Sequence, residues 1–327
     1  MSVGTRFAGP AASGARSRGR AADRIGDGVL RGLCLIASAL AVLAIGAIVY
    51  QVAHGASPAI SRFGLSFLTH STWQPNFERF GAGVLLYGTA VTSFATLLLA
   101  VPIGVSIALY LSMVAPQRLR GVIGPLVEML AAIPTVILGF WGILVFGPFL
   151  QAHVEPFLHS AFGFLPIFGG AQTTGTGLFN ATLILTIMVV PIIASISRDL
   201  FLTVPQELKD GATALGATRW EVIRGVVIPS AASGVVAATF LALGRALGEA
   251  IAVTQVIGAG NAIHTSLFKT GDTLASRIAD QFPSAITKLH IGSLFYLGLI
   301  LLVIELVANI GAQFIGRRFD VGRGLAQ

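Results

Sequence analysis

The chain has 327 residues, of which 54% are hydrophobic and only 11% are charged, and its mean hydropathy is +0.83. A soluble domain carries roughly 25% charged residues, so this composition excludes an ordinary water-soluble protein. The formal net charge of +7 follows the membrane topology described below, and no nucleic-acid partner is predicted.

The N-terminal residues 1–31 are rich in Ala, Gly and Arg. They hold too little apolar surface to form a core, and we predict a disordered basic tail. The apolar block that follows is longer than the 7–15 residues of a signal-peptide core, so it is expected to remain as an anchor. Cys34 is the only cysteine, which excludes an intrachain disulfide and a cysteine-rich metal site.

Long apolar blocks dominate the rest of the chain, and each is long enough to cross ~30 Å of hydrocarbon as a helix. They are Leu33–Val52, Val84–Val114, Val122–Leu150, Leu178–Val204, Ala231–Gly258 and Ile291–Ile315. We therefore predict an all-α polytopic membrane protein with about six spans within residues 32–316, followed by a basic cytoplasmic tail, residues 317–327.

The basic residues predict the orientation. With a cytoplasmic N-terminus, the inside segments hold Arg6, Arg16, Arg18, Arg20, Arg24, Arg31, Arg118, Arg120, Arg198, Lys209, Arg219, Arg224, Arg317, Arg318 and Arg323. The outside segments hold Arg62, Arg79, Lys269, Arg277 and Lys288, which are interpreted as solvated loop charges. This asymmetry follows the positive-inside rule and places both termini in the cytoplasm.

Aromatic residues gather between the first two spans. They are Phe63, Phe67, Trp73, Phe77 and Phe80. Aromatic side chains near the end of a span usually anchor it at the membrane interface, and that is the role predicted for them.

The cytoplasmic segment 203–229 predicts two short helices. Thr203 opens the first with a capping-box pattern, and Gly216 stands where a left-handed residue would end it. Thr218 and Glu221 repeat the capping box at the start of the second helix. The sequence therefore predicts a helical hairpin at the cytoplasmic surface.

One face of this hairpin is apolar, because Leu208, Ala212 and Leu215 recur at helical spacing. Pro229 is expected to close the second helix. Such a knob suits the groove of a partner protein, although a connector that packs on its own bundle stays open as the alternative.

Arg245 is predicted near the middle of the fifth span, with Glu249 one turn further on. A central arginine costs roughly 2.5–3.5 kcal/mol on insertion scales, so it must face protein or water. It either forms a structural ion pair with Glu249 or meets an anionic substrate, since a guanidinium matches oxyanions. Gly244 and Gly248 would let another helix approach closely. Glu128 and Glu305 are interpreted as structural or gating residues.

Two rival classes lack support. An intramembrane enzyme would need a motif such as His-Glu-x-x-His or Gly-x-Ser-x-Gly, and neither occurs. A passive channel would leave the hairpin unexplained and lacks charged rings or a filter-like loop. No Gly-x-x-x-x-Gly-Lys-Ser/Thr loop occurs either, so nucleotide must act on a separate subunit. The chain is predicted to be a transport subunit without catalytic residues, metal or cofactor of its own.

The hairpin resembles the EAA loop of ABC-importer permeases. The matching residues are Asp210, Gly211, Ala212 and Gly216, followed by Val226-Val227-Ile228-Pro229. They depart from that pattern by Asp for Glu, by Gly for the first Ala, and by Val and Ile near the end. In that family the loop contains the coupling helix that docks on the ATPase subunit.

Further blocks resemble the phosphate permeases of the PstC family, which are type I importers. They are Tyr87-Gly88-Thr89, residues 100–104, 108–112, 131–136 and 139–142, the block 244–250 around Arg245, and residues 273–282. The resemblance implies a bacterial inner-membrane importer half that pairs with a PstA-like permease. It also implies two PstB-like ATPases, which bind ATP and Mg, and a PstS-like binding protein that delivers phosphate. It assigns Arg245 and Glu249 to transport; sulfate or molybdate stays open as the substrate.

Overall fold

A computed structural model describes residues 15–170 and 175–318. Within them every regular element is helical, apart from an isolated β-bridge between Gln74 and Arg79. Six helical segments are long and apolar enough to span a membrane: Asp27–Phe63, Gly83–Val114, Thr135–Phe162, Leu178–Thr203, Arg219–Gly248 and Lys288–Gly316. The predicted all-α class with six spans is confirmed; the cytoplasmic placement of the termini stays a prediction. The described residues divide after His54 into two separate compact units.

The first unit consists of most of helix α1 (Ala15–Phe63). The helix begins at Ala15, inside the segment for which the sequence predicted disorder, because Ala and Arg are strong helix formers. Residues 1–14 lie outside the described residues. Apolar side chains along α1 are exposed, for example Leu40 at 62% and Tyr50 at 70%. A helix with this surface needs lipid or another subunit to cover it.

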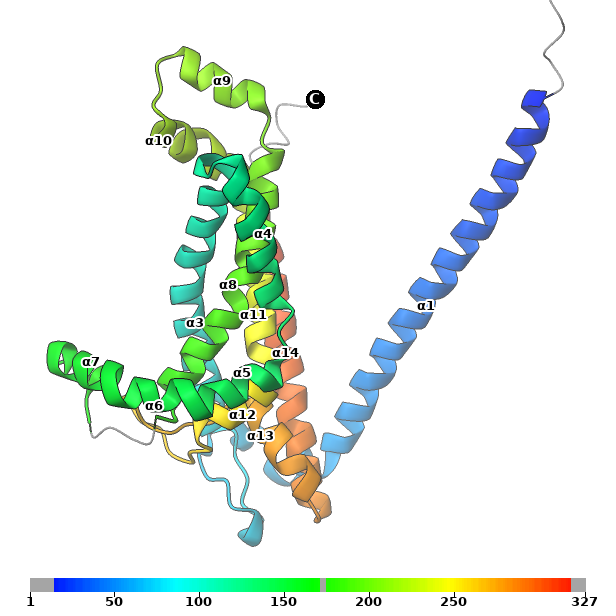
Figure 1. Ribbon diagram of the computed structural model, residues 1–327. Coiled ribbons are helices and arrows are strands. Elements are labelled where there is room, and N and C mark those ends of the chain that lie inside the picture. Colours follow the sequence, from blue (N-terminus) through cyan, green and yellow to red (C-terminus); the bar gives the residue numbers. More distant parts are fainter. Residues whose placement is uncertain (1–14, 171–174, 319–327) are drawn as a thin grey trace, which may run out of the picture. The chain divides into compact units, whose positions relative to one another are not determined.

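The second unit is built on four long helices that run side by side (Figure 1). They are α3 (Gly83–Leu109), α8 (Leu178–Thr203), α11 (Ile228–Gly248) and α14 (Lys288–Arg318). Helix α8 is the central one, because 67% of its apolar window is buried, against 22–33% for the windows in the other three. Gly104 lets α3 approach closely, since an added Cβ would lie 2.9 Å from Ile193 of α8.

The third apolar block is not one helix, so the predicted span Val122–Leu150 is wrong. Helix α4 (Gln117–Ala131) ends before Pro134, which has extended backbone at ψ 132° and precedes α5 (Thr135–Trp141). Proline disfavours helical backbone at the residue before it, and this breaks the block. The helix then continues through the π-turn η3 (Gly142–Phe146), α6 (Gly147–Phe149), the π-turn η4 (Leu150–Val154) and α7 (Glu155–Phe162). In Figure 1 the α5–α7 segment runs crosswise to the four long helices.

The fifth block also differs from the predicted span Ala231–Gly258. Helix α11 ends at Gly248, and the separate helix α12 (Ile251–Ile257) follows. At its other end, α11 is continuous with the hairpin through the π-turn η6 (Ile223–Val227). The prediction that Pro229 closes the hairpin is therefore wrong, because the helix continues past Pro229 through α11.

The remaining short elements gather at the two ends of the bundle (Figure 1). Helices α9 (Gln206–Ala214) and α10 (Arg219–Val222) form one end, called the hairpin end. Helices α12 and α13 (Leu274–Gln281) and the segment 64–82, with α2 (Ser66–Thr69) and η1 (Pro75–Phe77), lie at the opposite end. The other short helices are η2 (Tyr110–Val114), η5 (Pro166–Phe168) and η7 (Phe282–Ser284).

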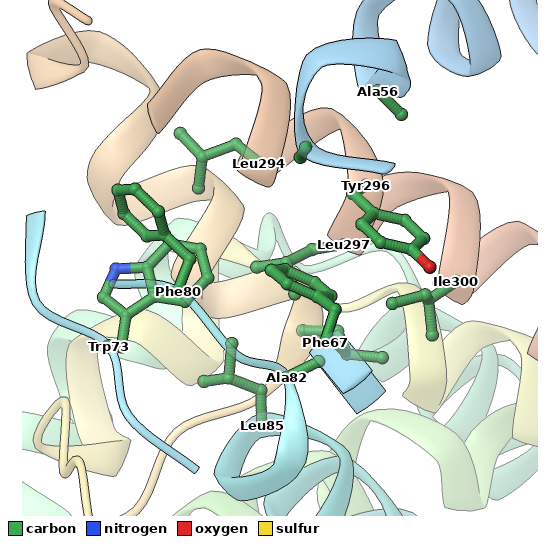
Figure 2. Close-up of a cluster of buried hydrophobic side chains, with 12 residues drawn as sticks. Ala56, Phe67, Trp73, Phe80, Ala82, Leu85, Leu294, Tyr296, Leu297 and Ile300 are labelled. Carbon is green, nitrogen blue, oxygen red and sulfur yellow. The ribbon is translucent and has the colours of Figure 1, made fainter. Parts of the chain in front are cut away.

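An aromatic cluster holds the opposite end together (Figure 2). Phe67, Trp73 and Phe80 are at most 5% exposed, so their predicted role as interfacial anchors is wrong. Phe67 stacks on Tyr296 of α14 at 4.5 Å between ring centroids, and Trp73 meets Phe80 edge-on at 5.0 Å. Such pairs add about 0.5–1.5 kcal/mol beyond their area burial. Phe67, Trp73 and Phe80 are therefore core, whereas Phe77 of the same segment is 73% exposed.

Candidate functional site

Arg245 lies in the last turn of α11 rather than in the middle of a span. The helix ends because Glu249 adopts extended backbone, at φ −72° and ψ 112°. The Arg245 Nη2 atom is 3.8 Å from Glu249 Oε2. The Arg245 side chain is 45% exposed, whereas the Glu249 side chain is 7% exposed. The predicted pair therefore forms, but its two members have different surroundings.

Glu249 has a second partner inside the fold. Its Oε1 accepts a hydrogen bond of 3.2 Å from the backbone N–H of Ala252, in the first turn of α12. The buried carboxylate thus joins the two helices, and it holds the guanidinium of Arg245 from one side. This geometry leaves much of the guanidinium accessible to an anion, because its pairing is long and one-sided.

Glu305 of α14 lies beside the same turn. A Cβ added at Gly248 would be 3.4 Å from Glu305 Oε1, whereas one added at Gly244 would meet nothing within 4 Å. Gly248 therefore accommodates α14 of this chain, and the side of Gly244 is open. The structure brings Arg245, Glu249 and Glu305 to one region of the molecule.

Glu128 is engaged elsewhere. Its Oε1 is 3.1 Å from Arg198 Nη2 of α8, and Arg198 also contacts Asp199 at 3.1 Å. Gly124, one turn before Glu128, makes room for the guanidinium, because a Cβ there would lie 2.9 Å from Nη1. This pair ties α4 to α8, and no ion pair within residues 27–170 and 175–316 connects Glu128 to Arg245.

The hairpin helices begin and end largely as predicted. Gly216 has φ +89°, and the amides of Gly216 and Ala217 bond back to Thr213 and Ala212 in a Schellman motif. The capping box of Thr218 and Glu221 is present. The first predicted capping box is wrong, because Thr203 belongs to the end of α8 and bonds Leu200 O.

One face of the hairpin carries large apolar side chains without cover from this chain. Leu208 is 52% exposed, Leu215 92% and Trp220 62%, whereas Ala212 packs against the cluster around Phe201. Exposed apolar groups clustered on two short helices mark an interaction surface. A connector that packed on its own bundle would have buried them. Asp210 and Gly211 are also exposed on α9.

A buried ion pair at the opposite end was missed by the sequence analysis. Arg277 Nε is 2.6 Å from Asp272 Oδ2, and both side chains are at most 3% exposed. Arg277 also donates to Asn261 Oδ1 at 2.6 Å and lies 5.7 Å from the centroid of the Trp73 ring. Its interpretation as a solvated loop charge is wrong. The capping-box pattern of Thr273 and Ser276 was the available signal that this segment is ordered.

Asp272 sits in a network of donors. It accepts hydrogen bonds from the Ser276 hydroxyl and from the Thr273 amide. Burial raises the pKa of the Asp272 carboxyl above its ordinary value, and the Arg277 charge and these hydrogen bonds oppose that rise. The pair therefore depends on all its partners being in position.

Three consecutive residues of helix α3 contact the segment that contains Asp272. Tyr87 Oη donates to His264 O at 2.7 Å, and Thr89 Oγ1 accepts from the Leu274 amide at 2.9 Å. Gly88, between them, packs directly on the Asp272 backbone, and a Cβ there would lie 1.9 Å from the Asp272 carbonyl oxygen. The Tyr87-Gly88-Thr89 block of the sequence is thus a docking surface for the segment after α12.

We predict that Gly88→Ala destabilises the protein, because backbone cannot move aside as a flexible side chain does. Overpacking of this kind costs about 1–3 kcal/mol, and the thermal midpoint of the purified chain should fall accordingly. The matched control is Gly121→Ala in α4, where an added Cβ meets nothing within 4 Å; it is expected to be neutral or stabilising. Equal midpoints for the two variants would contradict the docking role of Gly88.

Residues 27–170 and 175–316 contain no group of three or more His, Cys, Asp or Glu side chains that could hold a metal ion. The ion pairs within the same residues each join an arginine to a carboxylate.

Solved structures share this architecture. A chain of the crystal structure of a bacterial alginate ABC transporter aligns with a TM-score of 0.60 at 18% identity, covering 91% of this chain and 99% of that one. The MetNI methionine ABC transporter aligns with a TM-score of 0.53 at 20% identity, covering 72% and 96%. The bundle with its hairpin is thus a fold that this chain shares with these transporter chains.

The sequence comparisons show the class of protein, a permease subunit of an ABC transporter, and the family within it. The family described as binding-protein-dependent transport system inner membrane component matches residues 100–321. The phosphate transport system permease protein PstC of Mesorhizobium japonicum is 42% identical over 91% of this chain and 92% of its own length. The PstC proteins of Pasteurella multocida and Haemophilus influenzae are 45% and 43% identical, covering 81% and 87% of this chain and 83% and 91% of their own lengths. The chain belongs to this transport family and, within it, to the PstC permeases.

Proposed function

We propose that this multi-pass protein forms half of the translocation pathway of an ATP-driven phosphate importer in the bacterial plasma (inner) membrane. The names of its relatives support phosphate as the substrate. The excess of Arg and Lys in the segments connected to the hairpin end supports a cytoplasmic hairpin and two cytoplasmic termini.

The importer is proposed to contain four kinds of subunit. This chain pairs with a PstA-like permease, two copies of a PstB-like ATPase bind ATP and Mg, and a PstS-like protein delivers phosphate from outside. Import against a gradient needs an energy source, and the absence of a phosphate-binding loop in this sequence supports an ATPase on a separate subunit.

The observation that carries the proposal is the exposed apolar face of the hairpin, formed by Leu208, Leu215 and Trp220. This exposed face favours a binding surface for another protein over a connecting segment that packs on its own bundle. Since α10 is continuous with α11 through a π-turn, a push on the hairpin is transmitted along one helix to Arg245. The helix from Ile228 to Arg245 measures about 26 Å at 1.5 Å per residue.

Arg245 is proposed to meet the phosphate on the pathway, and Glu249 to position it. Alternating access then follows if closure of the ATPases tilts α11 and exposes the Arg245 region first to one side and then to the other. Glu305, beside the same turn, would repel an anion that is not held by the guanidinium. It is assigned a gating role, and Glu128 a structural one.

The anion specificity is tested in proteoliposomes that contain the complete importer. ATP hydrolysis is measured after addition of binding protein loaded with phosphate, and separately of the corresponding proteins loaded with sulfate or molybdate. We expect stimulation with phosphate alone. Stimulation by sulfate or molybdate, without any by phosphate, would assign the chain to the alternative oxyanion class.

A further inference from the structure

A cavity at the hairpin end has no role in the transport account. Its volume is about 590 Å³, within the range of about 300–1,000 Å³ that is usual for small-molecule sites. Three cations line it, Arg120, Lys209 and Arg219. The other lining residues are Ser112, Met113, Val114, Leu202, Gln206, Thr213, Val222 and Ile223.

The charge in this cavity is unbalanced. No acidic residue is among those that line it. Ion pairs within residues 27–170 and 175–316 involve Arg62, Arg198, Arg245 and Arg277, so none of the three lining cations has an acidic partner there. Arg120 is fixed by a hydrogen bond of 3.1 Å from its Nε to Ala115 O. Cations that share a cavity repel one another unless an anion joins them.

The lining is separate from the face of the hairpin that is proposed to grip the ATPase. On α9, Gln206, Lys209 and Thr213 follow at helical spacing and share the face turned to the cavity. Leu208 and Leu215 are not among the lining residues and are exposed. The cationic face is therefore free to hold a ligand while a partner protein covers the apolar face.

We propose that this cavity binds a phosphate-bearing anion. Arg120, Lys209 and Arg219 supply the charge and the hydrogen-bond donors. The side chains of Ser112, Gln206 and Thr213 donate within the chain, to Leu109 O, Asp210 Oδ1 and Asp210 O. The apolar part of the lining suits a carbon chain attached to the phosphate. Two sources share this chemistry: the headgroup of an anionic phospholipid and free inorganic phosphate.

A bound anion would link the hairpin to the rest of the bundle. Arg120 belongs to α4, Ser112 to the end of the α3 span, and Lys209 to α9. The ligand therefore bridges the elements that must move together during coupling. This inference concerns binding only and does not depend on which substrate the importer carries.

The test compares two variants of the purified chain that each remove two positive charges, one from α4 and one from the continuous helix formed by α10 and η6. Arg120→Gln with Arg219→Gln changes the cavity. The control, Arg118→Gln with Arg224→Gln, changes exposed cations outside it on α4 and η6. Both variants retain Arg245, so phosphate bound on the transport pathway contributes equally. Binding of phosphatidylglycerol is measured by native mass spectrometry, and binding of inorganic phosphate by calorimetry in lipid-free detergent.

We expect at least about tenfold weaker binding of one probe by the cavity variant, and unchanged binding by the control. Loss confined to phosphatidylglycerol identifies a lipid site, and loss confined to inorganic phosphate identifies a site for the free ion. If the cavity variant is not recovered folded, Lys209→Gln with Arg219→Gln replaces it, since this leaves the Arg120–Ala115 bond intact. Equal binding of both probes by cavity and control variants, or no binding to the wild-type chain, overturns the proposal.

Discussion

Replacement of Arg245 by Gln is expected to abolish phosphate uptake while leaving the protein assembled in the membrane. A hydrogen bond to a charged group contributes about 1.5–3 kcal/mol, so its loss slows uptake by at least about tenfold. The chain should still fold and assemble, because the buried Glu249 carboxylate keeps its hydrogen bond from the Ala252 amide when the guanidinium, 3.8 Å away, is removed. Uptake of labelled phosphate by cells, measured together with the amount of chain in the membrane, checks both parts.

Two further variants separate contact with substrate from a purely structural pair. Arg245→Lys keeps the charge but loses the planar guanidinium, so it should retain part of the uptake. Arg62→Gln breaks an exposed pair with Glu78 at 3.8 Å and is expected to leave uptake unchanged. Normal uptake by the Arg245→Gln variant would remove Arg245 from the substrate pathway.

Replacement of both Leu208 and Leu215 by Asp is expected to uncouple the permease from its ATPase. Both side chains are exposed, so the fold should tolerate the change within about 0.5 kcal/mol. Losing two apolar anchors from an interface costs about 2 kcal/mol or more, and the charges add a desolvation cost on docking. The ATPase should no longer copurify with the chain, and uptake should fall to background.

The matched control lies at the opposite end of the bundle. Ile286 is 91% exposed, and Ile286→Asp makes the same kind of surface change away from the hairpin. It is expected to retain the ATPase on the chain. If the hairpin variant keeps normal uptake, the exposed face of the hairpin has no part in coupling.

Local signals in the sequence were sufficient for much of the fold. The capping box of Thr218 and Glu221 and the left-handed Gly216 depend only on residues close in the chain, and both are present. The existence of the membrane-spanning helices was predicted from the long apolar blocks. Span boundaries failed where backbone breaks lie inside such a block, before Pro134 and at Glu249, because hydropathy does not change there.

The candidate site was predicted only in part, for a related reason. Arg245 and Glu249 are one helical turn apart, so their pairing was accessible to a sequence argument. The burial of Arg277 was not, because it depends on Trp73 and Asn261, which distant parts of the chain supply. The same holds for Glu305, which approaches Gly248 only once α14 packs on α11.

Site-directed crosslinking of the hairpin tests the central claim most directly. The chain has a single cysteine, Cys34, so Cys34→Ser provides a background without any. On it, Leu215→Cys places a thiol on the exposed hairpin face, and Ile286→Cys places an equally exposed one at the opposite end. In membranes that contain the whole importer, we expect the thiol at position 215 to crosslink to the ATPase and the thiol at position 286 not to. Absence of an ATPase crosslink from position 215, in an importer that takes up phosphate normally, would contradict the account.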